Sequence, residues 1–283
     1  MKLVTYLYNG KTAAGVLVKD TIIDLKTLGL PATMLEFVQA GPAAWQKAEA
    51  ARKTWAGATV PLASVRLLAP MPNPSKIIAI GLNYMDHCRE QKVQPPVRPL
   101  IFAKLTSAIV GPGDAIRWDT NVTQQVDFEV ELAVVIGKQA KNISQDKALD
   151  VVFGYTVMND ISARDLQFSD GQWVRAKSLD TFAPMGPAIV TANDIPDPQA
   201  LKLTCSVNGQ VMQDSSTKEM IFGVRHLIAD LTQFFTLEPG DIISTGTPHG
   251  VGVFRTPKVF LKDGDVVTAE IAGIGQLENT VRL

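Results

Sequence analysis

The chain has 283 residues, of which 46% are hydrophobic and 19% are charged, and its net charge at pH 7 is -1. This balance excludes an intrinsically disordered chain and a polyanion-binding surface, so we expect a small-molecule partner and no nucleic acid. No apolar run reaches the roughly 18 residues of a membrane span, and the N-terminus MKLVTYLYNG lacks the features of a signal peptide. These features predict a cytoplasmic protein with no membrane partner. Cys88 and Cys205 form no C-x-x-C pair, which predicts two free thiols.

The N-terminal stretch predicts a small unit of strands and helices. Residues 3–8 (LVTYLY), the turn signal Asn9-Gly10 and residues 16–25 (VLVKDTIIDL) together predict a β-hairpin.

Helical segments and a proline-rich connector follow the hairpin. Thr33 and Glu36 have the spacing of a capping box, and the Ala-rich segment after Gly41-Pro42 predicts helix to about Trp55. Three alternating prolines then suggest a connector, and they place a domain boundary between residues 1–70 and 71–283. These prolines are Pro70, Pro72 and Pro74.

An acidic alternation begins the strand predicted for residues 126–137, VDFEVELAVVIG. Asp127, Glu129 and Glu131 are spaced two apart, so on a regular strand they share one face. Two such carboxylates lie roughly 6.6 Å apart and repel each other by on the order of 2 kcal/mol at an effective dielectric near 20. A hard divalent cation would relieve this repulsion, although solvated acids at an exposed strand end fit the pattern equally well.

Polar residues after two other predicted strands extend the candidate site. The strand at residues 76–81 leads into GLNYMDHCRE, where His87 and Glu90 share one face of a predicted short helix. A carboxylate in that position can orient a histidine base, but a solvated surface pair is the commoner outcome. The strand VVFGYTVMND ends in Asp160, which either joins the acidic residues around one ion or caps the next turn.

Three further segments complete the prediction. PLIFAK is a predicted strand that ends at Lys104, and Lys177 lies in WVRAKSLDTFAPMGP among mixed polar residues, where a lysine is usually exposed. Residues 240–252, GDIISTGTPHGVG, predict a turn whose backbone N–H groups face an anion, without the pattern of a nucleotide-binding loop. Residues 218–235 predict one amphipathic helix packed on a sheet.

Several of these motifs, taken in order, resemble the fumarylacetoacetate hydrolase family. They are GLNYMDH, FEVELAVVIG, GYTVMNDISARD, AKSLDTFAPMGP and PGDIISTGTPHGVG. The segments FAKLTSAIVGPGD and GVFRTPKVFLKDGD are similar to those of one subgroup of this family, the fumarylacetoacetate hydrolase domain-containing 2 proteins. The resemblance implies a mixed α+β, mostly β fold, with a rolled sheet or β-sandwich in the catalytic domain, a small N-terminal α/β unit, and assembly as a homodimer.

The resemblance also implies roles for individual residues. Glu129, Glu131 and Asp160 match metal ligands, for Mg2+ with Mn2+ or Ca2+ as substitutes, and Asp127 is expected beside them rather than among them. His87 and Glu90 match a water-activating dyad on a lid segment, and Lys177 matches a catalytic lysine beside the metal. The matches to substrate-binding positions are Arg164, Gln167, Thr247 and, more weakly, Lys104.

The activity implied by these roles is metal-dependent chemistry on 2-oxo and 2,4-dioxo acids. We expect hydrolysis of the C–C bond of an acylpyruvate-type substrate, with an enolate held at the metal. The same site suits an oxaloacetate tautomerase or decarboxylase, or an isomerase of the 2-hydroxymuconate type. A non-catalytic metal- or ligand-binding β protein is a minor alternative, because binding alone requires no base.

Overall fold

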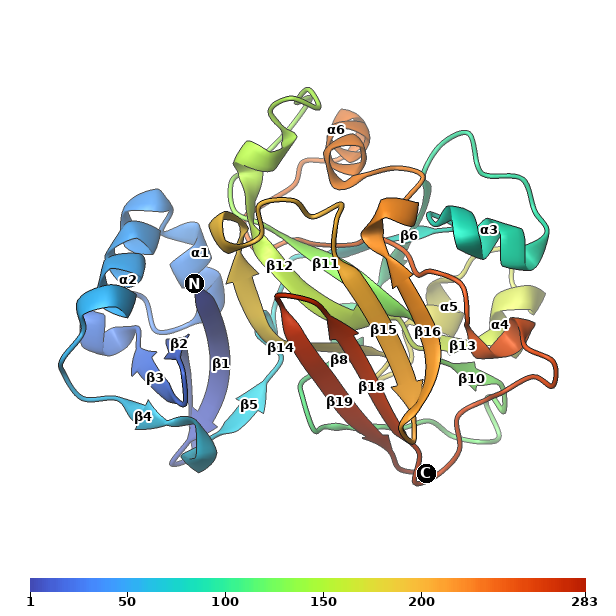
Figure 1. The fold of residues 1–283 in the computed structure, drawn as a ribbon, viewed down its shortest axis with the longest axis horizontal. Coiled ribbons are helices and arrows are strands. Elements are labelled where there is room, and N and C mark those ends of the chain that lie inside the picture. The colour runs from blue at the N-terminus through green and yellow to red at the C-terminus, as the bar shows by residue number, and fades with distance from the viewer.

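One large sheet runs through the molecule and carries most of the strands (Figure 1). The structure is a computed structural model that describes residues 1–283. The sheet has 12 strands, ten of which follow the order β4 (Val60–Pro61), β3 (Thr21–Asp24), β2 (Lys11–Val18), β1 (Lys2–Tyr8), β14 (Ala183–Thr191), β12 (Val152–Asn159), β11 (Val130–Ile136), β17 (Ile242–Ser244), β6 (Ile77–Gly81) and β7 (Leu100–Lys104). Two short strands pair outside this path: β5 (Arg66–Leu68) with β1, and β8 (Ile109–Val110) with β14.

A second sheet packs on one face of the large one and forms a sandwich. Its five strands follow the order β16 (Gln210–Ser216), β15 (Lys202–Val207), β18 (Val266–Ile271), β19 (Gly275–Val281) and β9 (Ala115–Ile116). Leu132 and Val134 of β11 share one hydrophobic core with Leu203 of β15 and Leu277 of β19. The predicted mixed, mostly β fold is therefore confirmed.

The N-terminal unit differs from the predicted hairpin by one extra strand. Residues 11–25 form two strands, β2 and β3, because the chain turns at Lys19, whose φ is 51°. Thr33 caps α1 (Met34–Gln39), and its side chain accepts a hydrogen bond from the Glu36 N–H group, as the capping box predicts. Helix α2 (Pro42–Thr54) starts at the proline that follows Gly41.

This unit shares its sheet and core with the rest of the chain. Strand β1 pairs with β14, with Leu3 opposite Ile189, and Leu3 and Phe37 belong to the same hydrophobic core as Val135 and Ile189. The boundary predicted near residue 70 stays a prediction.

The predicted acidic strand is interrupted near its start. A two-stranded sheet pairs β10 (Val126–Asp127) with β13 (Ser162–Ala163), and β11 begins only at Val130. Side-chain oxygens accept hydrogen bonds from the backbone at the break. The Glu129 N–H group donates to Asn159 Oδ1 at 3.0 Å, and the Val130 N–H group donates to Gln213 Oε1 at 2.9 Å. The break lets Glu129 leave the regular alternation of the strand.

Short helices surround the end of the molecule that lies away from the N-terminal unit (Figure 1). They are α3 (Met85–Gln91), α4 (Arg164–Ser169) and α5 (Val174–Lys177). The predicted helix at residues 218–235 is shorter than expected, because α6 (Val224–Phe234) begins after Gly223 and buries Leu227 and Leu231. None of the helices combines the length and the apolar character needed to cross a membrane.

Candidate active site

Three buried carboxylates converge where β11 and β12 meet the short helices. Glu129 lies at the strand break, Glu131 lies in β11, and Asp160 directly follows β12. One oxygen of each lies within 4.8 Å of the others, and the residues are 5%, 1% and 0% exposed. The Asp160 N–H group donates to the Glu129 carbonyl at 2.9 Å, which fixes the two segments together. The predicted convergence of these residues is confirmed, and the solvated alternative is wrong because all three are buried.

Three cationic side chains hold two of these carboxylates. Lys177 Nζ lies 2.6 Å from Glu129 Oε2 and 2.8 Å from Asp160 Oδ2, and Lys104 bonds Asp160 and the Lys177 carbonyl. Arg164 Nη2 lies 2.6 Å from Glu129 Oε1. Burial raises the pKa of Glu129, but Lys177 and Arg164 outweigh this effect and hold that pKa at about 2. Glu129 is therefore a permanent anion at neutral pH.

Glu131 has no cationic partner of its own. Its Oε2 accepts hydrogen bonds from Ser244 Oγ at 2.6 Å and from the Gly246 N–H group at 2.9 Å. Burial, together with the charges of Asp160 and Glu129, raises the pKa of Glu131 to about 8. The apo site thus contains one buried carboxyl group that lacks a positive charge to stabilise its ionised form.

The donor set of this site fits a hard divalent cation. All three candidate ligands are carboxylate oxygens, which Mg2+, Mn2+ and Ca2+ prefer over softer ligands. A divalent cation would supply the positive charge that Glu131 lacks. Glu129, Glu131 and Asp160 are the residues that would hold it.

The His87–Glu90 pair lies beside the carboxylates rather than in solvent. Both residues are on α3, and His87 Nδ1 lies 2.8 Å from Glu90 Oε2. His87 is 5% exposed and lines the same cavity as Glu129, Glu131 and Asp160. Its ring contacts Phe254 edge to face, with 5.9 Å between the centroids. The predicted helix segment therefore lies against the site, and its role as a lid stays a prediction.

The loop at residues 245–253 supplies backbone donors to carboxylates of the site. Besides the Gly246 bond to Glu131, the Gly250 N–H group donates to Glu90 Oε1 at 2.8 Å. The Gly252 N–H group donates to Asp127 Oδ1 at 2.7 Å. The sequence predicted backbone donors that face an anion, and the structure shows that the protein's own carboxylates are those anions.

The predicted substrate-binding residues divide into two groups. Arg164, Gln167 and Thr247 line the cavity, and Arg164 Nη1 donates to Gln167 Oε1 at 2.8 Å. Lys104 does not line the cavity, because its ammonium group lies behind Asp160 with no exposed side-chain surface. This placement differs from the expected substrate contact, and Lys104 instead holds a candidate ligand.

Asp127 lies beside the ligands, as expected, and acts through Arg164. Its Oδ2 accepts from Arg164 Nε at 2.9 Å, so one carboxylate orients the guanidinium group that reaches Glu129.

Several cavity residues are absent from the sequence-based prediction. Phe102, Trp173 and Phe254 form aromatic walls, and Gln91 Nε2 lies 2.7 Å from His87 Nε2. The position of Gln91, four residues after His87 on a predicted helix, is a signal that could have found it. The aromatic residues come from separate segments, and no local pattern brings them together.

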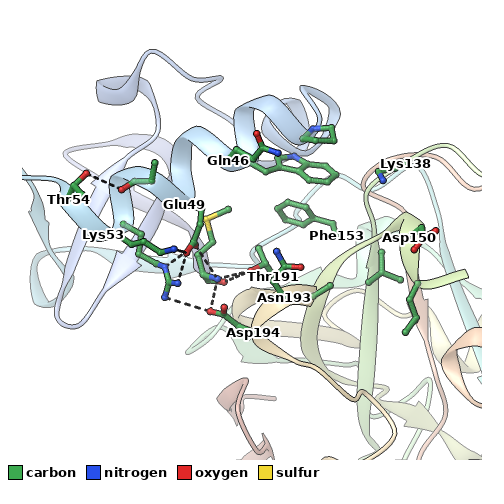
Figure 2. A pocket seen from close by; sticks show the side chains of 18 residues that line it. Gln46, Glu49, Lys53, Thr54, Lys138, Asp150, Phe153, Thr191, Asn193 and Asp194 are labelled. Atoms are coloured by element: carbon green, nitrogen blue, oxygen red, sulfur yellow. Dashed lines mark hydrogen bonds and ion pairs between the residues drawn. The ribbon is translucent and has the colours of Figure 1, made fainter. Parts of the chain in front are cut away.

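A larger cavity of about 980 Å³ lies elsewhere, between α2 and the ends of β12 and β14 (Figure 2). Trp45 and Phe153 form its aromatic side, with ring centroids 4.9 Å apart. The charged groups on its α2 side pair with one another, as Arg52 does with Glu49 at 2.6 Å. It contains neither a carboxylate cluster nor a histidine, so we place the active site in the smaller cavity around the triad.

Divalent-metal binding should release most of one proton at pH 7. Glu131, with a pKa of about 8, is largely protonated at that pH in the apo protein, and a ligand carboxylate must be ionised. Metal affinity should therefore rise with pH up to about pH 8. Titration calorimetry with Mg2+ in two buffers of different ionisation enthalpy measures the released protons. Glu131→Gln should bind metal more weakly and release no proton, whereas proton-free binding by the wild-type protein would contradict the assignment.

Comparisons with known proteins agree with this geometry. The family model described as fumarylacetoacetate (FAA) hydrolase C-terminal matches residues 76–282. The chain is 50% identical over 264 residues to the Xenopus laevis protein named oxaloacetate tautomerase fahd2, mitochondrial, covering 92% of this chain and 82% of the relative. The solved structure of a fumarylacetoacetate hydrolase from Exiguobacterium antarcticum has 37% identity and a TM-score of 0.88, covering 100% of this chain and 99% of the other. A maleylpyruvate hydrolase from Sphingobium sp. SYK-6, in complex with manganese(II) and pyruvate, has 32% identity and a TM-score of 0.83 at the same coverage. The chain therefore belongs to the fumarylacetoacetate hydrolase family of enzymes.

Proposed function

We propose that the protein catalyses the keto–enol tautomerisation of oxaloacetate. One observation carries the proposal: a cavity of about 80 Å³ is lined by the carboxylate triad and by His87, with Arg164 and Lys177 in the same wall. A histidine base beside a site for a divalent cation suits proton transfer at the carbon next to a 2-oxo group. The name of the Xenopus laevis relative, at 50% identity, supports the same reaction.

His87 is the residue that would move the proton. Glu90 accepts the Nδ1 hydrogen bond at 2.8 Å, so the Nε2 atom carries the lone pair. In the keto form Nε2 takes a proton from C3, and in the reverse direction the imidazolium returns it. The Glu90 carboxylate stabilises the imidazolium, because it faces the ring at hydrogen-bond distance. The Gly250 N–H group holds Glu90 in that position.

The size of the cavity, together with the charge that a bound divalent cation would add, favours a small dianionic acid. Arg164 and Lys177 are buried cations that already pair with Glu129, so further positive charge would have to come from the metal. The cavity space of about 80 Å³ suits a four-carbon acid better than a long acylpyruvate. A divalent cation held by Glu129, Glu131 and Asp160 would polarise the 2-oxo group and thereby acidify the neighbouring C–H bond. Lys177 places a positive charge where negative charge develops on the substrate oxygen.

Hydrolysis of an acylpyruvate is the second candidate. The sequence motifs favour it, and the solved maleylpyruvate hydrolase shares the fold at 32% identity. The names of the more similar relatives support the tautomerase better. The manganese(II) ion in the maleylpyruvate hydrolase complex supports a divalent cofactor for this chain, with Mg2+ proposed as the ion.

The deciding experiment follows both reactions in the same protein. Enol-oxaloacetate is added to the protein with Mg2+, and the loss of the enol absorbance gives the rate of ketonisation above the buffer rate. Acetylpyruvate is tested in parallel for release of pyruvate. We expect a kcat/KM for tautomerisation at least about 10-fold above that for hydrolysis, since one well-placed hydrogen bond changes discrimination on this scale. The opposite ratio would favour the hydrolase.

Assembly and location stay predictions for this chain. The homodimer rests on the family resemblance. The Xenopus laevis relative carries the word mitochondrial in its name, and the predicted cytoplasmic location has no support from that comparison.

A further inference from the structure

Gln91 covers the nitrogen of His87 that performs the chemistry. Its Nε2 atom lies 2.7 Å from His87 Nε2, on the side of the ring opposite Glu90. An amide nitrogen only donates, so in this arrangement the imidazole lone pair accepts from Gln91 and the Nδ1 atom carries the ring proton. The atom that has to receive a proton is therefore occupied by a side chain of the protein itself.

The position that Gln91 occupies is also the position of a hydrolytic water. Water activated by His87 has to lie within hydrogen-bond distance of Nε2, and the Gln91 amide is at that distance. Phe254 closes another side of the ring. The cavity leaves about 80 Å³ beside this amide, and a bound acid would fill that space, so a water at Nε2 would need the place of the amide.

The Gln91 side chain is able to move without disturbing the fold. Gln91 is the last residue of α3, its side chain is partly exposed, and its amide forms one hydrogen bond, to His87. Lys92 ends the helix with a φ of 56°. Rotation of the side chain would break only the bond to His87.

We propose that Gln91 selects tautomerisation over hydrolysis, an inference that rests on the proposed function. When a 2-oxo acid with a carboxylate on C3 binds, the Gln91 amide transfers its hydrogen bond from His87 to that carboxylate. His87 Nε2 then accepts the C3 proton, the C–H electron pair becomes the C2–C3 double bond, and the C2–O π pair moves to the oxygen, which takes a proton from solvent. The imidazolium then returns its proton to solvent, so the net change is the shift of one proton from C3 to oxygen. The amide remains beside the imidazole and keeps water from that place.

Hydrolysis requires the place that Gln91 fills. In an acylpyruvate, water would give a proton to His87 Nε2 while its oxygen bonds to C4. The C3–C4 electron pair would then leave with the pyruvate fragment, and C3 of that fragment would take the proton back from His87, which gives acetate and pyruvate. Loss of the amide therefore opens this second reaction, provided that its volume is not replaced by another side chain.

Two substitutions at residue 91 separate the volume of the side chain from its hydrogen bond. Gln91→Ala removes both, whereas Gln91→Met keeps a similar volume and removes the donor. Each variant should raise KM for oxaloacetate roughly 10-fold or more, with a smaller change in kcat, because a hydrogen bond to a charged group is lost. Only Gln91→Ala should gain acetylpyruvate hydrolysis, by at least about 10-fold. In water enriched in oxygen-18 the acetate formed should carry the label.

The chain offers a matched control and a clear contrary result. Gln145 contacts His226 at 3.3 Å on the exposed surface, so Gln145→Ala removes an amide–imidazole contact and should alter neither reaction. A folded Gln91→Ala protein without new hydrolysis, or equal gains in the Ala and Met variants, would overturn the role of Gln91. A wild-type protein that does not accelerate ketonisation would overturn the proposed function instead. The assay of acetylpyruvate hydrolysis does not depend on that result.

Discussion

Replacing His87 with alanine should lower kcat for oxaloacetate tautomerisation by a factor of about 10² to 10⁴, the usual contribution of a general base. His87 is the one histidine that lines the cavity, and the carboxylates beside it are the candidate metal ligands. Its ring forms hydrogen bonds with Glu90 and Gln91 and none with the candidate metal ligands. The affinity for Mg2+ should therefore stay within a few-fold of wild type. Steady-state kinetics and calorimetry on the same preparation measure the two quantities.

Glu90 gives a graded version of this test. Glu90→Gln keeps a hydrogen-bond acceptor near Nδ1 and removes the negative charge, so its effect on kcat should be smaller than that of His87→Ala. His226→Ala, which changes a histidine of α6 outside the site, is the matched control and should leave both quantities unaltered. If the His87→Ala variant had the same kcat as the wild-type protein, His87 would have no part in the proposed proton transfer.

Removing the divalent metal with EDTA should abolish tautomerisation, and Mg2+ or Mn2+ should restore it. In the apo site the anions Asp127, Glu129 and Asp160 are already paired with the positive charges of Lys104, Arg164 and Lys177. Glu131, whose pKa is raised to about 8, has no cationic partner. A substrate with two negative charges would enter this site at a further electrostatic cost. A divalent cation held by Glu129, Glu131 and Asp160 would offset that charge and would polarise the 2-oxo group.

Thermal unfolding provides a readout of metal binding that does not depend on turnover. A metal concentration of 100 times Kd should raise the free energy of unfolding by about 2.7 kcal/mol in the wild-type protein. Glu131→Gln should lose most of this increase at the same concentration. Glu219→Gln removes an exposed carboxylate that pairs with Arg89, and it should keep the increase. Equal stabilisation in all three proteins would place the ion elsewhere.

The sequence predicts the candidate ligands well because each lies at the end of a strongly apolar strand. Strands β11 and β12 are buried along their whole length, so their boundaries and the acids beside them are visible in the pattern. The interruption at Glu129 is not visible, because it depends on Asn159 and Gln213, which approach from distant segments. The burial of Lys104 cannot be predicted either, because it depends on contact between the end of β7 and Asp160, which lies far away in the sequence.

The family resemblance gives the residue types of the site, and the structure adds their connections. The loop at residues 245–253 is recognisable from its small residues, but nothing local indicates that its N–H groups serve Glu131, Glu90 and Asp127. Each of these bonds joins residues more than 100 positions apart. Such pairings follow from the order of strands in the sheet, which periodicity alone does not determine.

The pairing of β1 with β14 has a consequence for how the chain folds during synthesis. Leu3 leaves the ribosome early, yet its partner Ile189 is made almost two hundred residues later. Strand β5 covers this edge of β1 at Thr5–Leu7, but until β14 is made the start of β1, at Lys2 and Leu3, has open backbone groups that can pair with other chains. The start of the nascent chain therefore completes its strand pairing only when β14 emerges. Its pairing then joins the first and later parts of the chain in one cooperative unit.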